Sequence, residues 1–271
     1  MPSRTVSQGR FERVDYFGGR THGYKLDGVK IPSVTGMLRG IPKDLTSWAA
    51  WEAARYAVNN HQALFHGDDA NPATVMAEIA GAPTRARNAA GFSGTQVHRA
   101  AELLVRGERV DGIPDAYGDK VDAYVRFLDR WRVEPLLVEG SVCNLTVPYG
   151  GTLDVVFRSP LFPGRVFLGD VKTSRGVYPE NALQLAAYGR ADFYLDADGN
   201  EIPMAELGVT DHVVIHLTDD GYTVQQTFRG DAAWDLFLHG VAIARALEGR
   251  RGETDMDMLM LGPLYAPGEA W

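Results

Sequence analysis

The chain has 271 residues, with 27 lysines and arginines against 35 aspartates and glutamates, so its formal net charge is −8. This balance shows no overall basic character that would indicate a polyanion partner, and a hydrophobic content of 45% argues against wholesale disorder. No apolar run reaches the roughly 18 to 20 residues that cross a bilayer, and the N-terminus lacks the apolar stretch of a secretory signal. A single cysteine, Cys143, excludes an intrachain disulfide framework, an all-cysteine zinc site and a four-cysteine iron–sulfur cluster. We therefore expect a soluble cytoplasmic protein without membrane association.

The first half of the chain is predicted to be mainly helical. Residues 1–32 contain short β segments broken by glycines, and Ser33 or Thr35 is a candidate cap for a short helix that follows. Apolar residues then recur at helical spacing in further segments, one of which is expected to begin at a Ser/Gly/Thr turn. These predicted helices cover residues 44–65, 72–81, 91–108 and 115–133, with a loop over 67–72.

After Pro135 the pattern changes to β structure. Three apolar strands are separated by turns at PYGG and PLFPG, and a helix follows with Pro179 near its N-terminus. A hairpin then crosses Asp219-Asp220-Gly221, and a last helix is capped by Asp231. The strands are expected over 136–147, 152–159, 165–174, 212–218 and 221–228, the helices over 179–195 and 231–251, and an irregular tail over 253–271. This order predicts an α/β fold, with helices around a mixed sheet.

Two carboxylates and a lysine interrupt the predicted strands. Asp154 lies within TLDVVF, where a lone carboxylate is costly unless it is paired or bound to a metal, and Asp170 interrupts VFLGDVKTS. Lys172 stands two residues after Asp170 and so projects from the same face of its strand. If the two strands are neighbours, the three side chains converge on a point that suits a hard cation such as Mg2+ or Mn2+. The alternative, which is the commoner one for an isolated DxK, is a structural Asp–Lys pair at a strand end.

Three further polar side chains strengthen this pattern. Gln184 and Tyr188 are four residues apart and share a face of the predicted helix, although core packing of the pair is favoured when it is taken alone. His98 lies in the first turns of another predicted helix, with Glu102 one turn later, and a neutral imidazole is a good metal ligand. A helical histidine alone is more often structural. No ligand spacing is recognisable among the other histidines, which are His22, His61, His66, His212, His216 and His239.

In this order the residues resemble the PD-(D/E)xK nuclease superfamily, and in particular its RecB-type and CRISPR-associated-type exonuclease branch as encoded by bacteriophages. The matching strings are GTQVHRAAE, YGGTLDVVF and FLGDVKTSRGVYPENALQLAAYGRA, and the resemblance extends over about residues 31–245. It implies a mixed central sheet flanked by helices, the restriction-endonuclease-like core, in one compact domain. Residues 1–134 would form an N-terminal β/helical region that contributes His98, residues 135–250 the nuclease core and residues 251–271 a C-terminal tail.

The resemblance also implies roles for individual residues. The catalytic residues would be Asp154, Asp170 and Lys172, and the metal ligands would be the side chains of His98, Asp154 and Asp170 with the backbone carbonyl of Val171. Gln184 and Tyr188 match the QxxxY motif, which helps to position DNA, and Glu139 is a candidate supporting acid. Two departures are Leu153, where the family pattern has proline, and the absence of the cysteine set, which implies that there is no iron–sulfur cluster.

The implied activity is Mg2+- or Mn2+-dependent hydrolysis of phosphodiester bonds by a DNA exonuclease. It would act on linear ends or single strands in phage recombination, repair or replication, in the cytoplasm of a bacterial host. A recombination or helicase partner, the cleavage polarity and the oligomeric state are not predicted. Two alternatives are a noncatalytic DNA-binding accessory protein that keeps the nuclease fold, and a structure-specific endonuclease.

Because the chain is acidic overall, its contacts with DNA must be local. Arg85, Arg87 and Arg175 are the preferred phosphate contacts, because their positions bracket the motif residues. Arg106 and Arg109 are equally well explained as solvated helix charges. Trp48, Trp51 and Tyr56 are candidates for stacking on single-stranded bases, with core packing as the favoured alternative.

Overall fold

A computed structural model describes residues 9–16, 21–41, 43, 45–66, 71–110, 112 and 114–247 of the chain. Its central sheet has seven strands, which are β4 (Glu134–Asn144), β5 (Tyr149–Arg158), β6 (Val166–Lys172), β7 (Phe193–Leu195), β8 (Glu201–Pro203), β9 (Asp211–Thr218) and β10 (Gly221–Thr227). In space they follow the order β10-β9-β6-β5-β4-β7-β8. Neighbouring strands are antiparallel, except β6 and β9, which are parallel.

Burial explains why these sequences form these strands. β6 and β9 lie inside the sheet with both faces covered, so their sequences, VFLGDVK and DHVVIHLT, are nearly continuous apolar runs. β10 lies at the edge and carries exposed polar residues in GYTVQQT. The predicted hairpin of β9 and β10 across Asp219-Asp220 is confirmed.

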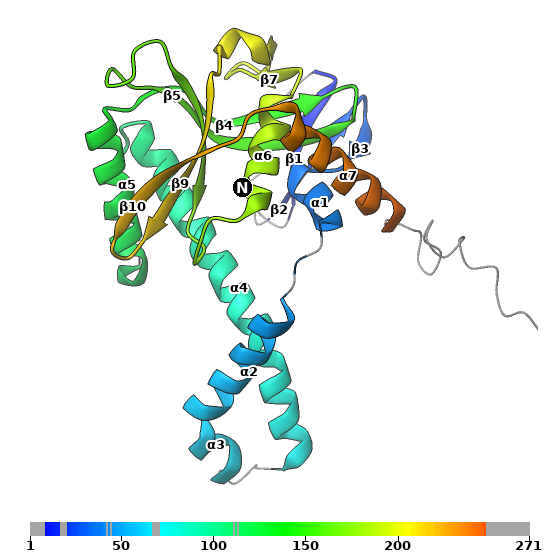
Figure 1. The fold of residues 1–271 in the computed structure, drawn as a ribbon, viewed down its shortest axis with the longest axis vertical. Helices are drawn as coiled ribbons and strands as arrows, with labels where there is room; N and C mark the ends of the chain where they lie inside the picture. Colours follow the sequence, from blue (N-terminus) through cyan, green and yellow to red (C-terminus); the bar gives the residue numbers. More distant parts are fainter. Residues whose placement is uncertain are drawn as a thin grey trace, which may run out of the picture.

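Helices cover both faces of the sheet (Figure 1). One face carries α1 (Val34–Met37), α6 (Pro179–Gly189) and α7 (Asp231–Leu247), and its core includes Leu168, Leu185, Val214 and Phe237. The other face carries the C-terminal half of α4 (Pro72–Val105) and α5 (Gly118–Trp131), and its core includes Phe127, Phe157 and Ile215. The coarse prediction of a mixed α/β fold with a helix-flanked sheet is therefore confirmed. No helix among the described residues is long and apolar enough to cross a bilayer.

A second, three-stranded sheet precedes these elements. It consists of β1 (Phe11–Tyr16), β2 (Thr21–Leu26) and β3 (Val29–Ile31), which are antiparallel in that order. Phe11 and Tyr24 stack on each other and pack against Cys143 and Phe193 of the large sheet. The short β segments expected before residue 32 are confirmed, and so is the helix cap at Ser33, whose Oγ accepts the Gly36 N–H at 3.0 Å.

A helical arm extends from the sheet (Figure 1). It consists of α2 (Thr46–Asn59), α3 (His61–His66) and the N-terminal half of α4. The prediction of separate helices over 72–81 and 91–108 was wrong, because α4 is one helix of 34 residues that includes Pro83. The expected Ser/Gly/Thr turn lies inside this helix, where the Thr95 hydroxyl donates to the Gly91 carbonyl one turn earlier at 3.0 Å. The helix predicted over 44–65 is divided at Asn60, whose side-chain amide donates to the Tyr56 carbonyl.

Two other expectations about local structure were wrong. The glycines of the predicted PYGG turn, Gly150 and Gly151, lie in β5, where a Cβ atom would come within 2.3 Å of Tyr24 and 2.6 Å of Tyr188. The glycines are therefore required by the packing of two rings on the strand and not by a turn. The helix predicted over 179–195 ends at Gly189, because its last residues form β7, in which Phe193 pairs with Cys143. The expected tail over 253–271 lies outside the described residues.

Candidate metal centre

The candidate centre lies where β5 and β6 diverge. The ladder between these strands ends at the pair Val155 and Gly169, one residue short of Asp154 and Asp170. Beyond that pair, the Val171 N–H donates to Asp154 Oδ2 at 2.6 Å. A side-chain carboxylate therefore replaces a strand carbonyl as the acceptor, and both aspartates stand at the end of the ladder.

Three side chains from three elements form a cluster beside this point. His98 comes from α4, Glu139 from β4 and Asp154 from β5, and one ligand atom of each lies within 4.8 Å of the others. His98 Nδ1 is 3.4 Å from Asp154 Oδ1. These residues and Val171 line a cavity of about 10 Å³, which is about the space that one water molecule or a small ion needs.

Glu139 enters this cluster through an irregular backbone. Its φ of 52° lies in the left-handed region, at a cost of about 1 kcal/mol or more for a residue with a side chain. The β4–β5 register pairs Val138 with Val155 and Gly140 with Leu153, and it has no pair at Glu139. Sequence reasoning named Glu139 only as a supporting acid. The sequence shows a carboxylate in an apolar strand, but the backbone conformation that turns it toward Asp154 is visible only in the structure.

Asp170 and Lys172 form a buried ion pair next to the cluster. Asp170 is 1% exposed, and Lys172 Nζ lies 2.5 Å from its Oδ2. Apart from this contact with Lys172, neither Asp170 oxygen has a hydrogen-bond partner among the described residues. Asp170 and Lys172 were expected to share one face of their strand, and the contact between their side chains confirms this. The cluster of His98, Glu139 and Asp154 does not itself include Asp170.

Burial and mutual attraction determine the charges of the centre. Burial raises the pKa of Asp170 to about 6, although Lys172 opposes the shift. Burial would lower the pKa of Lys172, but Asp170 and then Asp154 raise it above its ordinary value, so the ammonium keeps its proton. Burial, followed by the charge of Asp154, raises the pKa of Glu139 to about 7.

His98 and Asp154 stabilise each other's charged forms. Burial would lower the pKa of His98 and raise that of Asp154, yet their interaction leaves the pKa of His98 above and that of Asp154 below its ordinary value. Three carboxylates are thus gathered with one imidazole and one ammonium. An acid-rich donor set, with a buried Asp170 that contacts Lys172 alone among the described polar groups, fits a hard divalent cation, which prefers carboxylate oxygens.

Gln184 and Tyr188 share a face of α6, as predicted. The Gln184 Nε2 donates to the Tyr188 hydroxyl at 3.0 Å, and both side chains are buried. Burial, followed by the charges of nearby groups of which Asp170 is the first, raises the pKa of Tyr188 well above its ordinary value. The pair therefore stays neutral, and the Tyr188 ring lies against Gly151 of β5.

Arg175 makes contacts that the sequence did not indicate. Its guanidinium lies 5.4 Å from the ring centroid of Trp51 and donates to Glu52 Oε1 at 3.3 Å. Glu52 is 3% exposed and also pairs with Arg55. The segment after β6 is thereby held against α2. Core packing was favoured for Trp51, but its side chain is 53% exposed.

The other arginines that were considered as phosphate contacts differ in whether an acidic residue already pairs with them. Arg85 lies 4.6 Å from the Tyr56 ring centroid and forms a 3.2 Å ion pair with Glu78, so its charge is already partnered. Arg87 is exposed on α4 and has no ion pair among the described residues. Arg106 pairs with Glu102 at 3.0 Å, in line with the interpretation of a solvated helix charge.

No protein-family model matches the chain, and no curated protein matches its sequence. Among solved structures, the crystal structure of SSO0001 is similar over 86% of this chain and 78% of that chain, with 12% sequence identity and a TM-score of 0.31. A likeness of this strength carries no argument about fold or function. The function is therefore inferred from the residues of the centre.

Proposed function

We propose that the protein is a metal-dependent DNA exonuclease of the PD-(D/E)xK type, built on a restriction-endonuclease-like core. The observation that carries this proposal is the buried Asp170–Lys172 pair beside the acid-rich cluster, at the point where two strands diverge. Such a grouping is costly to bury without a function, because each charged group loses its hydration even when it is paired. Perturbed pKa values concentrated in one place also favour a catalytic role.

The residues of the centre divide into two groups. His98, Glu139 and Asp154 would hold a divalent cation, Mg2+ or Mn2+, with Val171 lining the same cavity and Asp170 next to Val171 on β6. When bound, the cation supplies Lewis acidity toward a phosphate oxygen and lowers the pKa of a coordinated water. Lys172 keeps its proton and so holds a fixed positive charge, which is suited to stabilising negative charge that develops on the scissile phosphate.

DNA is the substrate that we infer for this centre, acted on at linear ends or in single strands. Arg87 of α4 and Arg175 of the segment after β6 are exposed cations on the stretches of chain that also carry His98 and Lys172, and Arg175 in addition pairs with Glu52. We infer a role in phage DNA recombination, repair or replication inside a bacterial host cell. No residue of the centre specifies a helicase or recombination partner.

The central experiment is cleavage of end-labelled DNA by purified Asp170→Asn and Lys172→Ala variants. Each variant is compared with a matched substitution far from the centre, Asp235→Asn on α7 and Lys30→Ala on β3, both at exposed positions. Linear duplex, linear single-stranded and circular single-stranded substrates are each incubated with Mg2+, Mn2+ or EDTA. We expect the unmodified protein and both controls to degrade linear DNA with metal only, and the two centre variants to lose at least about 100-fold in rate.

Other outcomes would contradict specific parts of the proposal. Full activity in either centre variant, or cleavage that persists in EDTA, would show that these residues do not form a metal-dependent catalytic centre. Cleavage of circular DNA at a comparable rate would indicate a structure-specific endonuclease. DNA binding without cleavage under any metal condition would indicate a noncatalytic accessory protein.

A further inference from the structure

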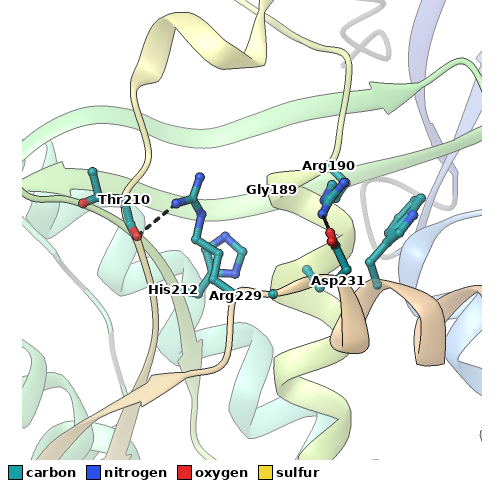
Figure 2. Close-up of a pocket in the computed structure, with 9 residues that line it drawn as sticks. Gly189, Arg190, Thr210, His212, Arg229 and Asp231 are labelled. Carbon is teal, nitrogen blue, oxygen red and sulfur yellow. Dashed lines mark hydrogen bonds and ion pairs between the residues drawn. The ribbon is translucent and has the colours of Figure 1, made fainter.

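A second candidate site lies apart from the metal centre. A pocket of about 580 Å³ opens between the C-terminal end of α6 and the N-terminal end of α7 (Figure 2). None of the residues that line it belongs to the metal centre or pairs with it. The side chains that determine its chemistry are those of Arg190, His212, Arg229, Asp231 and Trp234.

His212 is a buried histidine among the residues that line this pocket. The residue is 2% exposed, and neither ring nitrogen has a hydrogen-bond partner among the described residues. Its Nε2 lies over Gly189, where a Cβ atom would come within 2.6 Å, so glycine leaves the room that the ring occupies. Burial, and then the charge of Arg229, lower the pKa of His212 to about 4. The ring is therefore neutral at pH 7 and offers one donor and one acceptor.

The charges around the pocket favour an anion. Arg229 is exposed and donates only to the Thr210 carbonyl, at 3.3 Å, so its charge has no acidic partner among the described residues. Arg190 forms an ion pair with Asp231, on the other side of the pocket from Arg229 (Figure 2). Asp231 is thus the carboxylate paired at the pocket, while Asp211, whose charge also reaches Arg229 and His212, is itself paired with Arg165. The N-terminus of α7, a helix of 17 residues, adds partial positive charge at the same place.

The size and apolar wall of the pocket indicate more than a small inorganic anion. Its volume falls within the range of about 300–1,000 Å³ that is usual for sites of small organic ligands. Trp234 lines one side and is fixed by stacking on Phe237, with ring centroids 5.5 Å apart. An indole beside a cationic end suits a ligand with a phosphate group and a flat or apolar body.

We propose that this pocket binds a small phosphomonoester of nucleotide size. The phosphate group would contact Arg229 and Arg190, and the organic body would lie against Trp234. Because none of the lining residues belongs to the metal centre, the ligand would bind independently of that centre. This proposal does not depend on the proposed nuclease activity.

The test is isothermal titration calorimetry of the full chain with 5′-dAMP, in EDTA so that no metal reaches the other centre. Deoxyadenosine and inorganic phosphate are titrated separately. We expect saturable one-to-one binding of 5′-dAMP that is at least about tenfold tighter than that of either fragment. Arg229→Gln is expected to weaken binding by about tenfold or more, whereas Arg130→Gln, an exposed arginine on α5, is expected to leave it unchanged.

A second variant tests the role of His212 without changing any charge. Gly189→Ala places a Cβ against the ring, so we expect it to displace His212 and weaken 5′-dAMP binding severalfold in a protein whose circular dichroism is unchanged. Asp170→Asn should bind 5′-dAMP as the unmodified protein does. The proposal is overturned if folded protein shows no saturable binding, if deoxyadenosine binds as tightly as 5′-dAMP, or if Arg229→Gln and Gly189→Ala both keep full affinity.

Discussion

Glu139 joins the candidate metal centre through its backbone conformation and not through a sequence motif. Its left-handed φ coincides with the missing pair in the β4–β5 ladder, and its side chain meets His98 and Asp154. A strained conformation at an acidic residue persists only when the surroundings compensate for it. A ligand role for Glu139 explains why the strain is placed at this residue.

This role predicts a loss of metal affinity in Glu139→Gln. The amide keeps the volume of the side chain but removes its negative charge, so we expect Mn2+ to bind about tenfold or more weakly. Glu134→Gln, at the exposed start of the same strand, is the matched control. Calorimetric titration of Mn2+ gives both affinities. Equal affinity in the two variants would show that Glu139 is not a ligand.

His212 predicts a pH dependence of stability. Its pKa is about 4 in the folded protein, below the ordinary value of 6.5 that applies to the unfolded chain. Between these values the unfolded state binds a proton that the folded state does not, so stability is lost as the pH falls from about 6.5 toward about 4. The full loss from this residue is on the order of 3 kcal/mol.

Urea unfolding at pH 7 and pH 4.5 measures this effect. We expect the difference in unfolding free energy between the two pH values to be smaller in His212→Gln than in the unmodified protein. His239→Gln, an exposed histidine on α7, should keep the full difference. An identical pH difference in all three proteins would contradict a buried neutral His212.

At the scale of elements, α2 is attached to the segment after β6 by one buried carboxylate. Glu52 pairs with Arg55 on its own helix and with Arg175 on the other segment. Glu52→Ala removes the partner of both arginines, and we expect it to lower the unfolding free energy by about 1–3 kcal/mol. Arg175→Ala leaves Arg55 in place, so we expect a loss below about 1 kcal/mol.

Denaturant unfolding of the two single variants and of the double variant tests this arrangement. If the arginine acts through Glu52, the double variant should be no less stable than Glu52→Ala alone. Additive losses would mean that Arg175 stabilises the protein through Trp51 alone.

The elements differ in how far the sequence predicts them. β5, β6 and the β9–β10 hairpin follow from apolar runs bounded by turn residues, and the side-chain alternation of β6 correctly predicts that Asp170 and Lys172 meet. α4 was not predicted as one helix, because glycine and proline are local turn signals and packing against α2 overrides them. β7 and β8 are three residues each and form by pairing with a distant strand, which leaves no periodic pattern.

The residues of the metal centre and of the pocket also differ in how far the sequence predicts them. Asp154, Asp170 and Lys172 stand out in the sequence because charged residues are rare in apolar strands. Glu139 was underestimated, because a left-handed backbone has no signature at a glutamate. His212 was passed over because its distinguishing property is the lack of a partner, which only the packed structure reveals.

At the scale of the whole molecule, a net charge of −8 means that contact with DNA must depend on local arginines. Arg85 and Arg175 are partnered by acids, whereas Arg87 is exposed without an ion pair among the described residues. We therefore expect Arg87→Gln to reduce the slope of log affinity against log salt by about 1, as the loss of one phosphate contact does.

Fluorescence anisotropy of labelled single-stranded DNA at several salt concentrations, in EDTA, measures this slope. Arg85→Gln is expected to change the slope less than Arg87→Gln, and Arg130→Gln on α5 not at all. A slope that is unchanged in Arg87→Gln would exclude this face of α4 from the DNA contact.

The single parallel pair of the large sheet, β6 with β9, has a consequence for when the centre is completed. Lys172 on β6 is aligned with His216 on β9, and the whole of α6, β7 and β8 lies between them in the chain. Contacts between segments so distant in sequence form late in folding, and β9 leaves the ribosome well after β6. Until β9 docks, Asp170 and Lys172 stand on a strand with an open edge. We therefore expect the nascent chain to remain inactive until most of it has been synthesised.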